Sequence, residues 1–346
     1  MKGVKFGDYH TYDSWGLLMT PNWEIGLPEV KEKKINIEGA DGEQDYTDFF
    51  GGVKYGNRTL KFEFVYPTLV TGTEFMQKAS EIADKLNGQK LKVALDDDSE
   101  HYYTGRAKVT GFSVKKGIGT MEISVDAEPY RLKKDVSGKI IHLAGKNLIN
   151  LNEAVIGGTN TWVKTATGFT YTQTAGGGSY VFFNVPLEAG KTYTFSTKGT
   201  NLAQTSLYIY SDRIYGTAYK NSNTGAPCTF TPNKTAVYVC AIITNSTATS
   251  AEFSEVMLAE ASSVGTYEAY DSTVRTATVN ITGTRMATVP KIYATQGGIV
   301  TSKGVTSKLV AQGSIEVPEM QIEQGNNPFT ASASGRVLVS WQEGGL

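Results

Sequence analysis

The sequence predicts a mainly β protein with more than one domain. Gly, Thr, Ser, Tyr and Val are plentiful, and only one segment has a convincing helical period. Short alternating stretches separated by polar turns recur along the chain. At 346 residues the chain is longer than one ordinary core supports. We therefore expect two or three β-rich domains.

The charge balance argues against some classes of partner. The 33 basic and 34 acidic residues nearly cancel, which disfavours a general nucleic-acid or anionic-membrane surface. No apolar run approaches the roughly 20 residues of a membrane span. The N-terminus, MKGVKFGDYH, lacks the apolar centre of a signal peptide. We expect folding in a cytosol, with no nucleic-acid partner and no membrane partner.

Residues 1–131 read as charge-rich strands interrupted by one helix. Tyr12 to Met19 is predicted as a short strand, followed by a loop at Pro21-Asn22-Trp23. Residues 39–65 contain two Gly-rich turns and end in strict alternation, with Leu60, Phe62 and Phe64 on one side. The alternation predicts a half-buried strand.

One helix is predicted directly after this strand. Thr71 and Glu74 form a candidate capping box, and Gly88 follows as a left-handed stop. Apolar residues recur between them at helical spacing: Phe75, Ala79, Ile82, Ala83 and Leu86. Three strands are predicted next, at 91–95, 102–114 and 120–127. The Asp96-Asp97-Asp98 turn between the first two lacks the alternating spacing of a calcium loop.

The composition changes sharply near residue 146. Charged residues fall from about 42 of the first 145 to about 15 of the next 126, while Thr, Ser, Asn and Gly rise. Short strands then recur at spacings of about 10 to 15 residues, which is typical of a sandwich or jelly roll. We expect residues 146–270 to form a separate module.

The two cysteines, Cys228 and Cys240, flank a predicted hairpin turn at Pro232-Asn233-Lys234. Adjacent strands would bring them near each other, so a disulfide stays open. Reducing conditions during folding favour buried free thiols.

The N-terminal pattern G-x-D-G … GG-x-x-Y-x-x-R-x-L-x-F-x-F resembles the distal tail proteins of long-tailed phages, the Dit-like hubs of the tail tip. The end of the chain, with its proline-marked strand, GNN turn and V-x-V-S-W-x-E-G-x-L finish, resembles the C-terminal sandwich of the same family, a galectin-like fold. The "KNLI", "AGKTYTFS" and "FSEVMLAE" pieces of residues 146–270 resemble jelly-roll carbohydrate-binding modules of phage tail and wall-acting proteins.

The resemblance implies three domains. Residues 1–131 would be a ring-forming (belt) domain, a β-sandwich or split-barrel-like fold with one helix. Residues 132–145 and 271–346 would form the C-terminal β-sandwich, whose first strand lies near 136–143. Residues 146–270 would be a jelly-roll insertion in one of its loops.

The resemblance also implies a role. The protein would be a virion structural protein of the tail tip or baseplate, assembled in the host cytoplasm. It would form a hexameric ring between the tail tube and the tip proteins, and the insertion would bind host cell-wall polysaccharide during adsorption. The arm would touch a neighbouring subunit through five residues: Gly42, Phe49, Phe50, Tyr55 and Arg58.

Sugar binding requires aromatic faces flanked by polar groups. The insertion supplies such residues: Trp162, Tyr180, Tyr208, Tyr210, Arg213 and Tyr215. Alternation places Tyr208 and Tyr210 opposite Leu207 and Ile209. For each aromatic ring singly, a place in the core or its rim stays open.

A structural calcium is implied only by resemblance. Glu153 and Glu255 occupy positions where related modules hold this ion, although Asp would be expected at the second position. No other cofactor is expected.

Catalysis is not expected. The three histidines, His10, His101 and His142, show no metal-ligand or nucleophile spacing. Paired carboxylates alone would not identify a glycosidase. Two rival hypotheses remain, a secreted or surface glycan-binding adhesin and a polysaccharide depolymerase.

Overall fold

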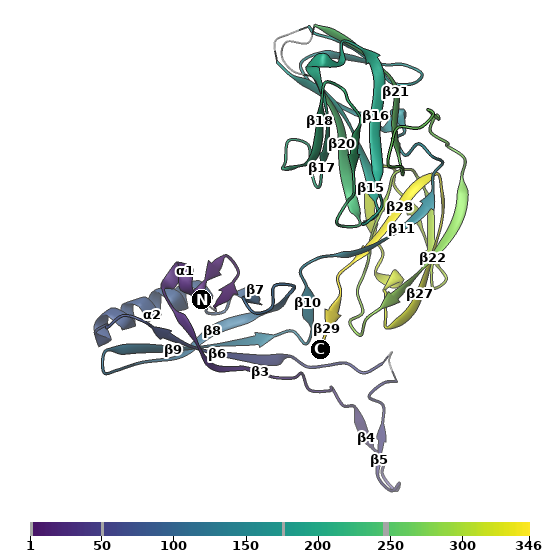
Figure 1. Cartoon of the computed structure of the whole chain (residues 1–346). Helices are drawn as coiled ribbons and strands as arrows, with labels where there is room; N and C mark the ends of the chain where they lie inside the picture. Colours follow the sequence, from purple (N-terminus) through teal and green to yellow (C-terminus); the bar gives the residue numbers. More distant parts are fainter. Residues whose placement is uncertain (1–2, 50–51, 175–176, 245–248) are drawn as a thin grey trace. The chain divides into compact units, whose positions relative to one another are not determined.

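The protein is mainly β, as predicted, with several sheets and few helices. The computed structural model describes residues 3–49, 52–174, 177–244 and 249–346. The chain forms two compact units (Figure 1). Unit 1 comprises residues 1–135 and 343–346, and unit 2 comprises residues 136–342. Among the described residues, no helix has the length and apolar character needed to cross a membrane.

Unit 1 is built on one sheet with strand order β2-β1-β7-β8-β9-β6-β3, to which β10 and β29 are attached. Its strands are β1 (Val4–Phe6), β2 (Tyr9–His10), β3 (Leu18–Ile25), β6 (Arg58–Tyr66), β7 (Lys90–Leu95), β8 (His101–Lys115), β9 (Ile118–Ala127), β10 (Arg131–Lys133) and β29 (Gly344–Gly345). The predicted alternation of β6 is confirmed, because Leu60, Phe62 and Phe64 are buried.

Helix α2 (Gly72–Leu86) packs on this sheet through the predicted apolar stripe. The capping box is confirmed: the Glu74 amide donates to Thr71 Oγ1, and the Thr71 amide donates to the Glu74 carboxylate. Gly88 follows the helix with φ of 76°, a left-handed value that glycine adopts without a Cβ clash.

The strand predicted at Tyr12–Met19 is wrong in its first half. Residues Thr11–Trp15 form a short helix, α1, and the strand β3 begins only at Leu18. His10 Nδ1 caps the first turn by accepting from the Asp13 amide, and Gly16 ends the helix with φ of 67°. Pro21 lies inside β3 at a register shift, where an edge strand tolerates the missing N–H.

An arm extends from unit 1 between β3 and β6. It contains the two-stranded pair β4 (Lys34–Asn36) and β5 (Glu43–Asp45), which stands away from the main sheet (Figure 1). An antiparallel bridge between Val30 and Tyr55 and a hydrogen bond from the Lys31 amide to the Lys54 carbonyl close its base.

In its described residues, unit 2 contains four sheets, which enclose two large apolar clusters. One cluster lies between the sheets β11-β28-β23-β26 and β22-β27-β24-β25. Their strands are β11 (Ser137–Leu143), β22 (Arg275–Gly283), β23 (Lys291–Ala294), β24 (Gly298–Ser302), β25 (Val305–Leu309), β26 (Gly313–Glu316), β27 (Gly325–Ala333) and β28 (Gly335–Trp341). A 3₁₀ turn, η3 (Pro318–Met320), precedes β27. The predicted strand near 136–143 is β11, which pairs with β28 along its full length.

The second cluster of unit 2 lies between the sheets β12-β15-β20-β17-β18 and β13-β14-β21-β16-β19. Their strands are β12 (Val155–Gly158), β13 (Thr161–Lys164), β14 (Phe169–Thr172), β15 (Ser179–Leu187), β16 (Tyr193–Thr200), β17 (Thr205–Tyr210), β18 (Ala218–Asn223), β19 (Cys228–Phe230), β20 (Ala236–Thr244) and β21 (Ser250–Ala259). Two 3₁₀ turns are η1 (Leu151–Glu153) and η2 (Leu202–Gln204). The predicted boundaries of 146 and 270 stay predictions.

Cys228 and Cys240 are both free and buried. They belong to β19 and β20, which lie in different sheets rather than on adjacent strands. Burial raises the pKa of Cys228 to about 11 and raises that of Cys240 as well, so both thiols are protonated near neutral pH.

Candidate carbohydrate-binding face

The sheet β12-β15-β20-β17-β18 has an apolar core face and an aromatic outer face. Leu207 and Ile209 are fully buried in the cluster shared with the opposite sheet. Tyr208 and Tyr210 alternate with them and belong to a separate, smaller cluster. The predicted two-sidedness of this strand is therefore confirmed, and it follows from the period of two in a strand.

The outer face gathers side chains from three strands and one loop. We call it the aromatic face, and its members are Tyr180, Phe182, Tyr208, Tyr210, Ile214, Tyr215 and Ile243. Register explains the grouping, because Phe182 and Tyr208 both lie opposite Ala241 of the central strand β20. The small Ala241 side chain keeps the centre of the face low, so the rings on either side define its surface.

The rings of the aromatic face are ordered against one another. The rings of Tyr208 and Tyr210 are parallel within 5°, with centroids 5.6 Å apart. Tyr180 meets Tyr215 edge to face at 5.3 Å. These are the arrangements that the quadrupoles of aromatic rings favour. Parallel and perpendicular rings held this way present preformed surfaces against which a sugar ring can stack.

Residues 211–217 form a loop over one end of the face. Tyr215 is 61% exposed and has a φ of 60°, whereas Tyr210 beneath the loop is 3% exposed. A left-handed tyrosine is strained, so the loop holds this ring in place at an energetic cost. Burial raises the pKa of both Tyr210 and Tyr215 above its usual value, which keeps both phenols neutral.

Two of the residues predicted to contact sugar, Trp162 and Tyr210, are buried and unavailable to a ligand. Trp162 is 8% exposed, packs against Tyr171 and Phe253, and donates from Nε1 to Ser179 Oγ at 2.7 Å. Trp162 is therefore a core residue, and neither face of its indole ring is open to a ligand. Tyr210 supports the aromatic face from below, under the loop. Tyr180, Tyr208, Tyr215 and the exposed Arg213 remain available.

Sequence reasoning missed Phe182 and Ile243, which complete the aromatic face. Asn221 was missed as well, and it lies opposite Tyr208 on the edge strand β18. Phe182 and Ile243 alternate with core residues in strands that read as continuously apolar. Their orientation depends on which sheet covers which face, and the linear pattern does not reveal that.

The predicted arm residues have different surroundings. Gly42 has φ of 80° with open space around it, and the Phe49 ring is 69% exposed. Tyr55 is half-buried at the arm base, where its ring meets that of Tyr130 at 6.3 Å. Phe50 lies outside the described residues. Gly42 and Phe49 are therefore accessible to a neighbouring chain.

The prediction that Arg58 contacts a neighbouring subunit at the surface is wrong, because its side chain is only 3% exposed. Its guanidinium carbon lies 5.5 Å from the centroid of the Tyr103 ring. Its Nε and Nη2 atoms have no hydrogen-bond partner within the described part of the chain. Arg58 therefore packs in the interior of unit 1 beside the arm and does not contact another molecule.

The two predicted calcium ligands do not form a recognisable cluster. Glu153 ends the turn η1, and Glu255 forms an ion pair with Lys198 at 2.8 Å. Within residues 3–49, 52–174, 177–244 and 249–346, no three His, Cys, Asp or Glu side chains gather closely enough to hold a metal ion. The calcium site stays a prediction.

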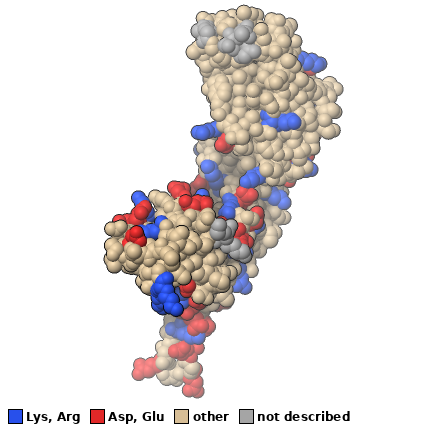
Figure 2. Space-filling model, turned by 60° about the vertical axis from the view of Figure 1, so that its left-hand side comes forward, with Lys and Arg blue, Asp and Glu red and all other residues tan. Residues whose placement is uncertain are grey.

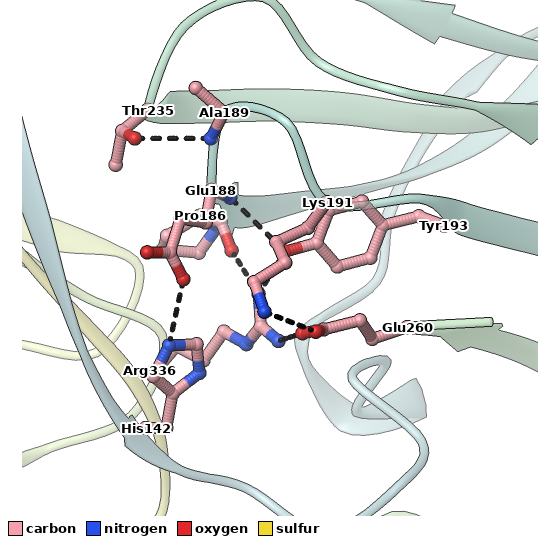
Figure 3. A network of polar contacts seen from close by, with 9 residues as sticks. All are labelled: His142, Pro186, Glu188, Ala189, Lys191, Tyr193, Thr235, Glu260 and Arg336. Atoms are coloured by element: carbon pink, nitrogen blue, oxygen red, sulfur yellow. Dashed lines mark hydrogen bonds and ion pairs between the residues drawn. The ribbon is translucent and has the colours of Figure 1, made fainter.

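The strand β15, which carries Tyr180 and Phe182, is anchored at its other end by Arg336 of β28 (Figure 3). Arg336 Nη1 donates to the Pro186 carbonyl at 3.0 Å and to the Tyr193 hydroxyl at 3.2 Å. Nη2 lies 3.4 Å from Glu260 Oε2. Arg336 is 4% exposed.

His142 and Glu188 add a second contact beside Arg336, with His142 Nε2 at 3.2 Å from Glu188 Oε2 (Figure 3). Burial and the nearby Arg336 charge lower the pKa of His142, against the raising effect of Glu188. The two contacts tie the sheet of the aromatic face to the strands β11 and β28.

No family model and no curated protein matches the sequence. Among solved structures, SPP1 Dit (gp 19.1), described as a paradigm of the hub adsorption apparatus in phages that infect Gram-positive bacteria, aligns over 100% of both chains at 10% identity with a TM-score of 0.40. A conserved protein of unknown function from Pseudomonas aeruginosa PAO1 aligns over 60% of this chain and 99% of its own, at 12% identity and a TM-score of 0.16.

A structure of the triple jelly roll fold and turret assembly in an archaeal virus aligns over 93% of this chain and 90% of its own, at 10% identity and a TM-score of 0.14. All three TM-scores are below 0.5. None of these likenesses therefore carries an argument about the role of this chain.

Proposed function

We propose that the protein is a structural hub of a phage tail tip that binds host cell-wall polysaccharide through the aromatic face. The observation that carries the binding role is the smaller apolar cluster of the aromatic face, on the side of the sheet β12-β15-β20-β17-β18 that faces away from the core. A folded domain gains little by ordering aromatic rings on its outer surface unless something covers them. Stacking on sugar C–H surfaces is a use that suits such rings.

The hub role rests on the motif resemblance and on the arm. The arm exposes large apolar side chains that its two short strands have no core to bury: Leu27, Val30, Ile35, Ile37, Phe49 and Val53. An isolated two-stranded ribbon is marginal in water. Covering these side chains with a second copy in a closed ring would remove the exposure, and head-to-tail contact generates such rings.

The two roles reinforce each other through multivalency. A ring of subunits carries one aromatic face on each copy of the chain. Weak single sites therefore act together at a high effective concentration. Millimolar binding at each site corresponds to only about 4 kcal/mol. The anchoring of β15 by Arg336 supports this proposal, because sites on a defined scaffold lose less entropy when they bind together. The proposal contains no reaction chemistry.

Wall binding is tested by a pull-down on purified cell walls with the double variant Tyr208→Ala, Tyr215→Ala. We expect its binding to fall by about tenfold or more, which corresponds to about 1.4 kcal/mol. The matched control is Tyr267→Ala, which removes another half-buried tyrosine that lies outside the aromatic face. Equal binding by the double variant and the wild type would refute the role of the face.

Ring formation is tested by measuring the mass in solution. The variant deletes residues 32–53 and joins Lys31 to Lys54 through a Gly-Gly turn, because these two residues are already hydrogen-bonded at the arm base. We expect the wild type to assemble and the deletion variant to stay monomeric with unit 1 folded. Assembly of the variant would show that the arm does not make the contact.

A further inference from the structure

The polar groups beside the aromatic face are amides and hydroxyls. Asn221 lies opposite Tyr208, and Asn223 lies opposite Ser206 on the same side of the sheet. Ser206 Oγ donates to Asn223 Oδ1 at 3.1 Å. On the other side of β20, Asn184 of β15 follows Phe182 on the outer face. Such groups both donate and accept, which suits sugar hydroxyls.

Charged side chains are missing from the outer face of this sheet. The strands β12, β15, β17 and β20 contain no Lys, Arg, Asp or Glu at all. The fifth strand, β18, contains Lys220, which lies opposite Ile209 and therefore on the core side. Figure 2 shows one face of the molecule, on which Lys, Arg, Asp and Glu are sparser in the upper part of the surface than in the lower part.

The loop over the face adds one charge of each sign. Asp212 Oδ1 accepts from the Arg213 amide at 2.7 Å, and Arg213 is exposed. The two charges cancel, so the loop adds no net charge beside the rings. Polymers that carry phosphate or carboxylate are recognised by clusters of Arg and Lys that replace the water around each anion. A single arginine beside an aspartate does not form such a cluster.

The geometry of Tyr180 gives the face an extended flat edge. A Cβ atom on Gly157 would lie 2.2 Å from Tyr180 Cζ, so the ring lies directly against the backbone of β12. Tyr215 stands perpendicular to Tyr180 as a wall. A flat ring with one upright neighbour fits the broad side of a pyranose in a chain, with the neighbouring sugar running on over Tyr208.

We propose that the aromatic face binds an uncharged, extended glycan, rather than a wall polymer that carries phosphate or carboxylate groups. This inference rests on the proposed function, since it names the ligand class of the same face. Stacking and neutral hydrogen bonds supply the affinity, and long-range electrostatics contribute little.

The experiment measures binding of the full chain to purified bacterial walls before and after removal of phosphate-bearing polymers with cold hydrofluoric acid. Binding to each wall preparation is measured between about 0.1 M and about 1 M NaCl. Over this range the Debye length falls from about 10 Å to about 3 Å. We expect the chain to bind treated walls as well as untreated walls. We also expect its affinity for either to change by less than about twofold across the salt range.

Two variants sharpen the result. Gly157→Ala keeps every ring but displaces Tyr180, and we expect it to weaken binding by about fivefold to tenfold. Lys220→Gln removes the one cation of the five strands from the core side, and we expect no change. Gly157→Ala is accepted only if its thermal unfolding matches the wild type; otherwise Tyr180→Ala takes its place.

The failures are distinguishable. Binding that is lost with the phosphate polymers, or that falls by more than about fivefold with salt, overturns the uncharged ligand but leaves wall recognition intact. Binding that is unaffected in both Gly157→Ala and Tyr180→Ala overturns the placement of the glycan. No binding to any wall overturns the proposed function and this inference together.

Discussion

Replacing Arg336 with Met should destabilise unit 2 substantially. The guanidinium is 4% exposed and donates to the Pro186 carbonyl and the Tyr193 hydroxyl. Hydrogen bonds that involve a charged group contribute about 1.5–3 kcal/mol each. The Pro186 carbonyl would lose this donor inside the protein, while Tyr193 would still accept from the Glu188 amide.

Two effects reduce the loss. Arg336 Nε has no hydrogen-bond partner in the described part of the chain, so removing the guanidinium also removes an uncompensated burial cost. The contact with Glu260 at 3.4 Å is long, and that carboxylate is 38% exposed. We therefore expect a net loss of about 2–4 kcal/mol.

Calorimetry and urea titration of the full chain provide the measurement. For a unit of about 200 residues, this loss corresponds to a decrease in Tm of about 4–16 °C. The matched control is Arg275→Met, whose guanidinium pairs with Asp271 and donates to the Leu143 carbonyl but is 43% exposed, so water can replace both contacts. We expect it to cost less than about 1 kcal/mol. Equal effects of the two substitutions would refute the argument that burial gives Arg336 its importance.

The remaining expected effects concern His142, the two buried cysteines and the buried Arg58. The pKa of His142 is lowered in the folded protein, so the unfolded chain binds the proton first as pH falls. Unit 2 should therefore lose stability as pH drops below about 6.5, and His142→Gln should flatten this dependence in denaturation titrations. Neither cysteine should react with a maleimide at neutral pH in the native state, because burial raises the pKa of Cys228 to about 11 and also raises the pKa of Cys240. Mass spectrometry should find both cysteines labelled only after unfolding. Arg58→Met should leave the stability of unit 1 unchanged within about 1 kcal/mol or raise it, since Nε and Nη2 of the buried guanidinium have no hydrogen-bond partner in the described part of the chain. A larger loss in urea titration would contradict this interpretation.

Local patterns determined several elements of this protein without tertiary information. Helix α2 was predictable because its capping box and apolar stripe lie within a few residues of each other, and such interactions form inside the segment itself. The strand β6 was predictable because strict alternation has one solution at a buried surface. The two sides of β17 followed from the same period.

Other features were not predicted correctly from the sequence. The helix α1 forms where the sequence favours a strand, because His10 and Gly16 cap it on either side. Arg58 and Trp162 have the chemistry of surface recognition residues, yet distant strands cover them.

The aromatic face shows the division most clearly. Strand periodicity alone predicts that Tyr208 and Tyr210 share one side of β17, since side-chain direction alternates along any strand. The packing of the two sheets places Phe182 and Ile243 beside them and buries Trp162 in the core. That outcome depends on which of two apolar faces the opposite sheet covers, and burial of this kind is a property of the packed sheets together.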